Sequence, residues 1–315
     1  MNLFLVAAGL LLLALPGRSV ALGRRLAPAD WARLAAGSMS TGFLALRVGL
    51  LATATPTLLR LAGGHDLAMA CHELLRPVVP GGAITGVLSA LALAVIQQRH
   101  SRALLAGRRA RRALRVEPWL GQHHRRDDHD LVVIPSPTVC AYALDGRPPQ
   151  IVVSEGLATT LTDDELAAVI SHERCHVRCG HQRPLARATA TEAALRPLRS
   201  VGRSATIVRL AVERWADEAA ADHNDRSIVR SALGKVVATM LGEAPAAVPA
   251  FTGADTILER LSALDRTPRT LLRWRLAAAA PAVILIVTAA STVMAGATTL
   301  HHDLLGLARL CPFAP

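Results

Sequence analysis

The stretch Val169-Ile170-Ser171-His172-Glu173-Arg174-Cys175-His176 carries two histidines four residues apart, with a glutamate directly after the first. Thr162-Asp163-Asp164-Glu165 precedes it and has the form of a capping box, in which a hydroxyl residue is followed three positions later by a carboxylate. The residues from Leu166 to Ile170 are apolar and mostly good helix formers. We therefore predict one capped helix that contains both histidines.

On such a helix, residues four positions apart share a face, so His172 and His176 can present both imidazoles to one ion. Glu173 is offset by about 100° around the helix axis, and its carboxylate can reach a water on that ion without binding the ion itself. Two neutral histidines, an open position for water and a carboxylate base make up the H-E-x-x-H zinc site. The sequence thus predicts zinc (Zn2+) as cofactor, His172 and His176 as metal ligands and Glu173 as the catalytic base.

The candidates for a third metal ligand are Cys179, His181, Glu192 and Glu213. A metzincin would have a third histidine six residues after His176, but Gln182 stands there. Glu213 and Asp217 are again four residues apart, in an alanine-rich run around Trp215 that is typical of a packed helix. We predict that Glu213 is the third ligand and that Asp217 orients a ligand imidazole by accepting its free N–H.

A capped helix with H-E-x-x-H, followed by a helix with E-x-x-A-D (Glu213, Ala216, Asp217), resembles the gluzincin metallopeptidases of membranes. Two types share this pattern, the BlaR/MecR-type antirepressor peptidases and the HtpX/CAAX-protease type. The second type usually has membrane spans between its two motifs, whereas residues 177–212 here contain seven arginines and no segment able to cross a bilayer. The chain therefore resembles the BlaR/MecR type, over roughly residues 130–230.

This resemblance implies a peptidase that answers an external signal by cleaving a cytoplasmic protein, often a winged-helix repressor. The best-known members carry an external penicillin-binding sensor domain with a Ser-x-x-Lys nucleophile. The single lysine, Lys235, has Ala232 three residues before it, so we expect a member that lacks this sensor. An HtpX-like quality-control protease and a catalytically silent membrane receptor remain as alternatives, and the intact Glu173 argues against the receptor.

The apolar segments predict a mainly α, multi-pass membrane protein with about four transmembrane helices and a cytoplasmic α+β zincin-like metallopeptidase domain. The expected spans are at about 3–22, 38–60 and 78–96 within residues 1–96, and at 277–299 within residues 277–315; the peptidase domain is 97–276. Arg47 interrupts the second span, so it either snorkels to the cytoplasmic side or faces other helices.

Arginine placement predicts the orientation of the chain in a cell membrane. Arg18, Arg24 and Arg25 follow the first apolar segment, and seven arginines lie between residues 99 and 115, after the third. By the positive-inside rule both termini are external and the peptidase domain is cytoplasmic. A basic cluster directly after a span faces anionic lipid, so we expect the lipid bilayer as a partner and no direct nucleic-acid binding, despite a net charge of +11.

Short β-rich runs separated by proline and glycine predict a small sheet before the capped helix, with strands at 131–134, 139–144 and 150–153. In zincins an edge strand beside the motif helix commonly aligns the substrate as an added strand. Further helices are expected at 228–241 and 252–265. The histidines at 123, 124 and 129 are expected in a solvated loop rather than at a second metal site.

Two smaller sets of residues carry open predictions. The oxyanion of a peptidase needs a hydrogen-bond donor, for which His223, Arg226 and Arg260 are candidates, although surface charge is the expected role of each. Cys140, Cys175 and Cys179 are expected to be free thiols in a reducing compartment, whereas Cys71 and Cys311 would be external and able to pair.

Overall fold

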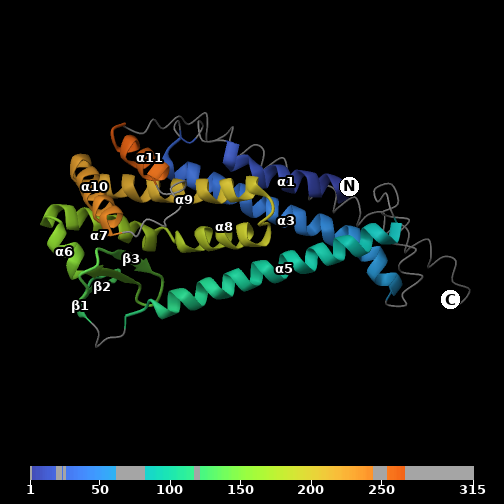
Figure 1. Ribbon diagram of the computed structural model, residues 1–315, viewed down its shortest axis with the longest axis horizontal. Coiled ribbons are helices and arrows are strands. Elements are labelled where there is room, and N and C mark those ends of the chain that lie inside the picture. Colours follow the sequence, from blue (N-terminus) through green and yellow to red (C-terminus); the bar gives the residue numbers. More distant parts are fainter. Residues whose placement is uncertain are drawn as a thin grey trace, which may run out of the picture.

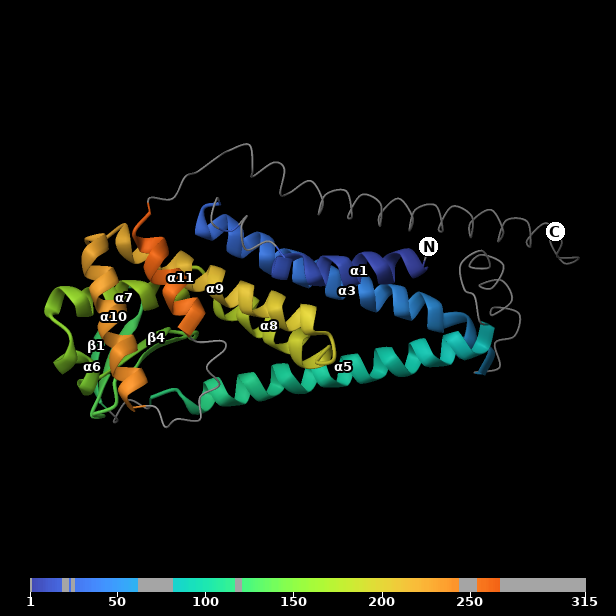
Figure 2. The ribbon, with the colours of Figure 1, turned by 45° about the horizontal axis from the view of Figure 1, so that its top comes forward.

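The computed structural model describes residues 2–18, 23, 26–61, 82–116, 121–243 and 254–266. It has a helical stalk and a head that contains the sheet and the H-E-x-x-H motif (Figures 1 and 2). The stalk contains α1 (Asn2–Arg18), α3 (Pro28–Leu61), α5 (Gly82–Ala113), α8 (Gln182–Ala194) and the first half of α9 (Arg199–Ala221). The head contains four strands, α6 (Glu155–Thr160), α7 (Asp163–Arg178), α10 (Arg226–Glu243), α11 (Ala254–Leu264) and the rest of α9.

The stalk has its own apolar core, in which α1 and α3 pack against the first half of α9. Its fully buried members include Leu13, Met39 and Val208. Two glycines allow α1 and α3 to approach closely, because a Cβ on Gly9 would lie 2.7 Å from the backbone nitrogen of Leu46. A Cβ on Gly42 would lie 2.8 Å from the carbonyl oxygen of Gly9. Small residues at such crossings are typical of helices that pack in membranes.

The sheet of the head has the strand order β1-β2-β4-β3. Its strands are β1 (Gln122–Arg125), β2 (Asp130–Ile134), β3 (Ala141–Leu144) and β4 (Gln150–Ser154). β2 and β4 pair in parallel, whereas β1–β2 and β3–β4 are antiparallel. All five residues of β4 are buried, which explains its unbroken apolar run. β3 lies at the edge of the sheet and packs beside α7. The structure confirms the three predicted strands.

The prediction for the histidines before β2 is wrong. His123 and His124 form part of β1, and all four residues of that strand are exposed. The strand lies at an edge with neither face covered, so its sequence shows no apolar alternation by which it could be recognised. His129 lies in the loop before β2, as predicted, but it is not solvated, because it is buried with its Nδ1 2.7 Å from Asp128 Oδ1.

The helix that carries the H-E-x-x-H motif begins as predicted. Thr162 Oγ1 accepts a hydrogen bond from the backbone N–H of Glu165 (3.3 Å), and Glu165 Oε2 accepts one from the N–H of Thr162 (2.9 Å). Glu165 also receives hydrogen bonds from Lys235 Nζ and Ser231 Oγ, each at 2.7 Å. One buried carboxylate therefore caps α7 and ties it to α10.

Within the part of the chain that the structure describes, two helices contain segments that are long and apolar enough to cross a membrane, Pro28–Thr55 in α3 and Gly82–Ala113 in α5. A buried core helix passes the same test of length and composition. α1 is a shorter apolar helix that ends at Arg18, before the predicted limit of the first span. α5 continues unbroken through residue 97, where the peptidase domain was expected to begin. The predicted fourth span, Cys71 and Cys311 lie outside the described residues.

The buried carboxyl of Glu165 should make the stability of the head depend on pH in the acid range. Hydrogen bonds from Lys235, from the Thr162 backbone and from Ser231 lower the pKa of this carboxyl from 4.5 to about 2. The lowered pKa stabilises the folded state fully above pH 4.5, and this contribution is lost as the pH falls from there towards 2. We expect Glu165→Gln to lower the melting temperature at neutral pH and to flatten the loss of stability across that interval. Thermal unfolding followed by circular dichroism at several pH values measures both effects.

The exposed neighbour Asp164 provides the control. Asp164→Asn should retain the acid profile of the wild type. A Glu165→Gln profile that parallels the wild type over the whole pH range would contradict the role given to Glu165.

Candidate metal centre

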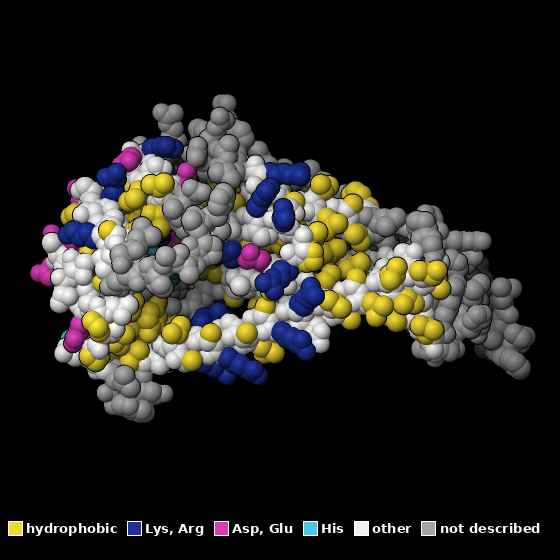
Figure 3. Space-filling view, viewed as in Figure 1, with side chains coloured by type: hydrophobic (Ala, Val, Ile, Leu, Met, Phe, Trp, Pro, Cys, Tyr) yellow, Lys and Arg dark blue, Asp and Glu magenta, His cyan; other side chains and the backbone are white. Residues whose placement is uncertain are grey.

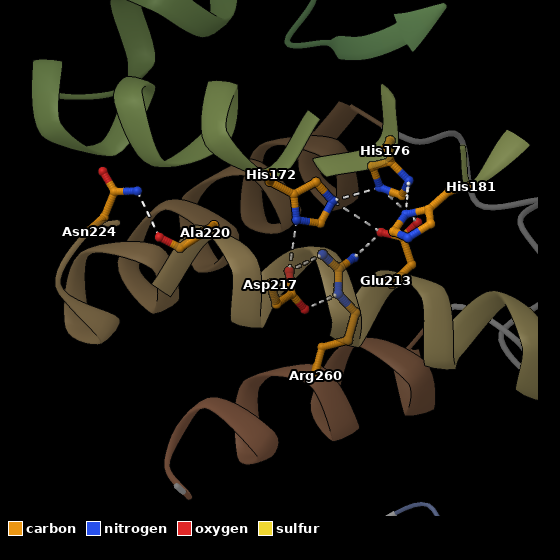
Figure 4. Close-up of polar contacts among 8 residues, drawn as sticks. All are labelled: His172, His176, His181, Glu213, Asp217, Ala220, Asn224 and Arg260. Atoms are coloured by element: carbon orange, nitrogen blue, oxygen red, sulfur yellow. Dashed lines mark hydrogen bonds and ion pairs between the residues drawn. The ribbon is translucent and has the colours of Figure 1, made fainter. Parts of the chain in front are cut away.

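His172 and His176 on α7 face Glu213 on α9, and their ligand atoms converge on one point (Figure 4). The two Nε2 atoms are 3.1 Å apart. Glu213 places Oε2 3.4 Å from His172 Nε2 and Oε1 3.6 Å from His176 Nε2. The structure thus brings together the two histidines of the motif and the glutamate that was chosen as third ligand. This glutamate lies 37 residues after His176, on a different helix.

These separations fit zinc. With zinc–ligand distances of about 2.0 to 2.2 Å, atoms at neighbouring corners of a tetrahedral site lie about 3.3 to 3.6 Å apart. Two imidazole nitrogens and one carboxylate, with a fourth corner left for water, form the donor set of catalytic rather than structural zinc sites.

Each histidine of the pair has a partner for its second ring nitrogen. His172 Nδ1 donates to Asp217 Oδ1 at 3.0 Å, as the sequence predicted for Asp217. His176 Nδ1 lies 3.1 Å from Nδ1 of His181, a buried residue in the turn after α7. A histidine that binds metal through Nε2 carries its proton on Nδ1, so His176 would donate this hydrogen bond. His181, considered as a metal ligand from its sequence position, therefore orients one instead.

Arg260 on α11 holds the two carboxylates of α9 in place. Its Nε and Nη2 atoms donate to Asp217 Oδ2 and Oδ1 at 2.8 and 2.7 Å, and its Nη1 lies 3.1 Å from Glu213 Oε2. Only 16% of its side chain is exposed, so the expectation of a surface charge was wrong for this residue. All three guanidinium nitrogens contact these carboxylates, so Arg260 stabilises their charges and fixes their positions.

The buried charges determine protonation in the centre. Burial disfavours the charged form of His172, but the carboxylates of Asp217 and Glu213 outweigh it and raise the pKa of His172 to about 10. Burial also opposes ionisation of Glu213, yet contacts with His172 and Arg260 hold the pKa of Glu213 well below its usual value. Burial lowers the pKa of His176 to about 3, which keeps it neutral. Metal binding must therefore displace one proton, held on His172 by the carboxylates.

Glu173 faces a cavity of about 270 Å³ that also reaches His172 and Glu213. Burial raises the pKa of the Glu173 carboxyl, and the nearby His172 opposes this rise. The wall opposite the metal ligands is apolar and consists of Leu157, Val229, Leu233, Val236 and Val237. Gln182 Nε2, at the start of α8, donates to the carbonyl of Ala143 on β3 at 2.6 Å, so a hydrogen bond joins the edge strand to α8.

The remaining sequence candidates lie away from the three ligand atoms. Cys179 Sγ is 3.6 Å from Cys175 Sγ, and these two free thiols form a separate donor group with His181. Glu192 pairs with Arg209 (3.0 Å). His223 is exposed and its Nδ1 contacts the carbonyl of Ala219, and Arg226 pairs with Glu218. Neither of these last two side chains contacts the metal ligands.

Substitution of Asp217 or Arg260 should reduce the affinity for metal. We expect Asp217→Asn and Arg260→Lys each to weaken zinc binding about 10- to 100-fold, because the ligands lose their orienting hydrogen bonds while all three ligand side chains remain. Competition with a chromogenic chelator measures the affinity. Asp222→Asn, at an exposed position just after α9, is the control and should bind zinc like the wild type. Equal affinities for Asp217→Asn and this control would refute the orienting role.

Comparison with known proteins shows that part of this chain is similar to a protein family. Residues 105–196 match peptidase family M48, a segment that includes α7 with its H-E-x-x-H motif and ends before Glu213. Over 151 residues the chain is 28% identical to the chloroplastic plastoglobule-localized metallopeptidase 48 of Arabidopsis thaliana. This alignment covers 46% of the chain and 44% of the relative, so the chain spans less than half of that protein. No solved structure matches.

The match covers the part of the centre that α7 supplies, whereas the positions of Glu213, Asp217 and Arg260 rest on the structure. It names M48 and not the BlaR/MecR type that the sequence pattern favoured. Residues 105–196 thus match a family of metallopeptidases, which implies a metal-dependent hydrolase of peptide bonds.

Proposed function

We propose that this protein is a membrane-bound zinc endopeptidase whose catalytic head lies in the cytoplasm. The observation that carries the proposal is the convergence of His172, His176 and Glu213 beside a half-buried Glu173. The family match over residues 105–196, which includes this motif, also supports peptide-bond hydrolysis. The two apolar helices α3 and α5 support the membrane placement, and the arginines that follow the apolar part of α5 support the cytoplasmic orientation.

Each residue of the centre has a separate role in the proposed hydrolysis. Zinc held by the three ligands would polarise the scissile carbonyl and lower the pKa of a coordinated water from 15.7 to about 7. Glu173, whose pKa is raised by burial, accepts a proton from the attacking water and passes it to the leaving amine. Asp217 and His181 hold the two imidazoles in the required tautomer, and Arg260 keeps Glu213 and Asp217 ionised.

An extended polypeptide suits the surroundings of the centre. β3 is an edge strand beside α7, and a peptide added to such an edge would run past Glu173. The apolar wall of the cavity would accept an aliphatic or aromatic side chain next to the scissile bond. Protein substrates are therefore the expected class.

Two physiological roles fit this activity. The first is regulatory proteolysis of a cytoplasmic protein, for example a winged-helix repressor, and it rests on the resemblance of the two motifs to the BlaR/MecR type. The second is HtpX-like quality control of membrane proteins, with which the M48 match is equally compatible. Of the two motif helices, α9 is partly in the stalk, where it packs on α1 and α3, so the active centre is tied directly to the apolar helices.

Glu173→Gln tests the activity. We expect the rate of peptide cleavage to fall at least about 10²-fold, because a general base contributes that much or more, while bound zinc stays at one equivalent. The measurements are cleavage of an unstructured protein by detergent-purified enzyme and metal analysis of the same sample. Glu155→Gln, at an exposed glutamate of α6, should cleave like the wild type. Cleavage by Glu173→Gln at the wild-type rate would overturn the assignment of the base.

The same variant distinguishes the two roles, because an inactive peptidase retains its substrates. Cross-linking of Glu173→Gln in cells, followed by mass spectrometry, should trap a small number of soluble regulators if the role is signalling. A broad set of misfolded membrane proteins would support quality control instead.

A further inference from the structure

Five arginines from three parts of the stalk lie at about the same level along it, four of them exposed and Arg47 half-buried, and we call them the arginine belt. They are Arg47 on α3, Arg99 and Arg102 on α5, and Arg196 and Arg199 at the turn between α8 and α9. In Figure 3 arginine side chains lie between the apolar end of the stalk and the head. The three groups are far apart along the chain, so their common level is not visible in the sequence.

Contacts between α3 and α5 place the first three arginines at one level. The rings of Phe43 and His100 lie with their centroids 4.6 Å apart, so Arg99 and Arg102 flank the level of Phe43. Arg47 stands one helical turn further from the head, but its guanidinium carbon lies 5.6 Å over the ring of Phe43. Its side chain thus reaches back one turn along α3 and lies close to His100 of α5, so Arg47 faces a neighbouring helix.

Contacts of α1 bring the turn between α8 and α9 to the same level. The N–H of Gly17 donates to Ser204 Oγ (3.0 Å), and Arg199 begins α9 five residues, or about 7.5 Å, further from the head. Gly9, which touches Gly42 and Leu46, lies eight residues or about 12 Å from Gly17 in the same direction. Arg199 is therefore within about one helical turn of Phe43 along the stalk axis.

Beyond the belt, the surface of α5 is apolar. Ile84 is 74% exposed and Leu91 58%, with Leu88 and Val95 exposed between and after them. Only Gly86 and Ser89 are buried on this helix among the described residues, so its apolar side chains do not form a protein core. From Gly82 to His100 the helix extends about 27 Å, close to the roughly 30 Å of a hydrocarbon layer. An exposed apolar band that ends at arginines matches the boundary between acyl chains and phosphates.

We propose that the arginine belt binds the phosphate groups of anionic phospholipids at the cytoplasmic face of the membrane. The proposal rests on the membrane placement given above and not on peptide hydrolysis. The sequence predicted that the whole basic cluster of α5 faces lipid, whereas this proposal limits the phosphate contacts of α5 to Arg99 and Arg102. Arg108, Arg109 and Arg112 are exposed on the same helix, but they lie about 9 to 15 Å beyond Arg102 towards the head. At this distance, beyond a Debye length of about 8 Å, attraction to the headgroups is largely screened.

This difference supplies a matched pair of variants. The belt variant carries Arg99→Gln, Arg102→Gln and Arg199→Gln, and the control carries Arg108→Gln, Arg109→Gln and Arg112→Gln. Both remove three positive charges from exposed positions of the full chain. Circular dichroism and zinc content show whether each variant is folded. A belt variant that fails this check is replaced by Arg99→Gln with Arg102→Gln alone, against Arg108→Gln with Arg109→Gln.

The measurement is the phosphatidylglycerol-to-phosphatidylcholine ratio of the lipid that remains bound after the protein is extracted from vesicles containing both. Wild type and control should enrich phosphatidylglycerol at least threefold over the bulk ratio, and the belt variant should fall close to that ratio. Equal enrichment by the belt variant and the control would overturn the proposal, and so would a loss confined to the control.

The experiment distinguishes a wrong lipid-binding proposal from a wrong membrane placement. If alkaline carbonate releases the wild type from the vesicles, the membrane placement fails, and the belt proposal fails with it. If the wild type stays in the membrane but does not enrich phosphatidylglycerol, only the belt proposal is wrong. Zinc-dependent cleavage, measured on the same samples, is independent of both results.

Discussion

The head depends on the contact between the carboxylates of α9 and the imidazoles of α7. Asp217 and Glu213 bring two negative charges into a buried site, where unpaired charges are costly. Arg260 offsets part of this charge through three nitrogen–oxygen contacts, and without metal a proton on His172 offsets more. The site therefore has a place for one more cation, and a divalent ion bound by neutral imidazoles takes the place of that proton.

The active centre and the stalk share side chains rather than being joined by a linker. Trp215 lies on α9 between Glu213 and Asp217, and its ring packs at 4.6 Å on His181, which orients His176. On α3, Arg33 places its guanidinium 4.6 Å from the centre of the Trp215 ring. The start of the long apolar helix α3 is thus connected to His176 through three contacts. A tilt of α3 relative to α9 would change the contacts of the Trp215 ring with Arg33 and His181.

Local sequence patterns were sufficient for the elements that carry their own signals. The capping box of Thr162 and Glu165 located the start of α7, and unbroken β-branched runs located β2 and β4, because these preferences act over a few residues. β1 was missed because an edge strand with both faces exposed has no apolar period. Arg260 was undervalued for a different reason. A lone arginine on a short amphipathic helix has the same sequence context whether it faces solvent or two buried carboxylates.

The sequence by itself determined the helical spacing of His172 and His176 and a second helix on which Glu213 and Asp217 share a face, and it led to the proposal of Glu173 as the base. These inferences need only the 3.6-residue period of a helix and the donor preferences of zinc. The tertiary structure alone decided that His181 supports His176, that Arg260 joins α11 to the ligand carboxylates, and that arginines from three parts of the stalk lie at one level. Such contacts depend on how helices pack against one another, which the spacing of residues within any single helix does not encode.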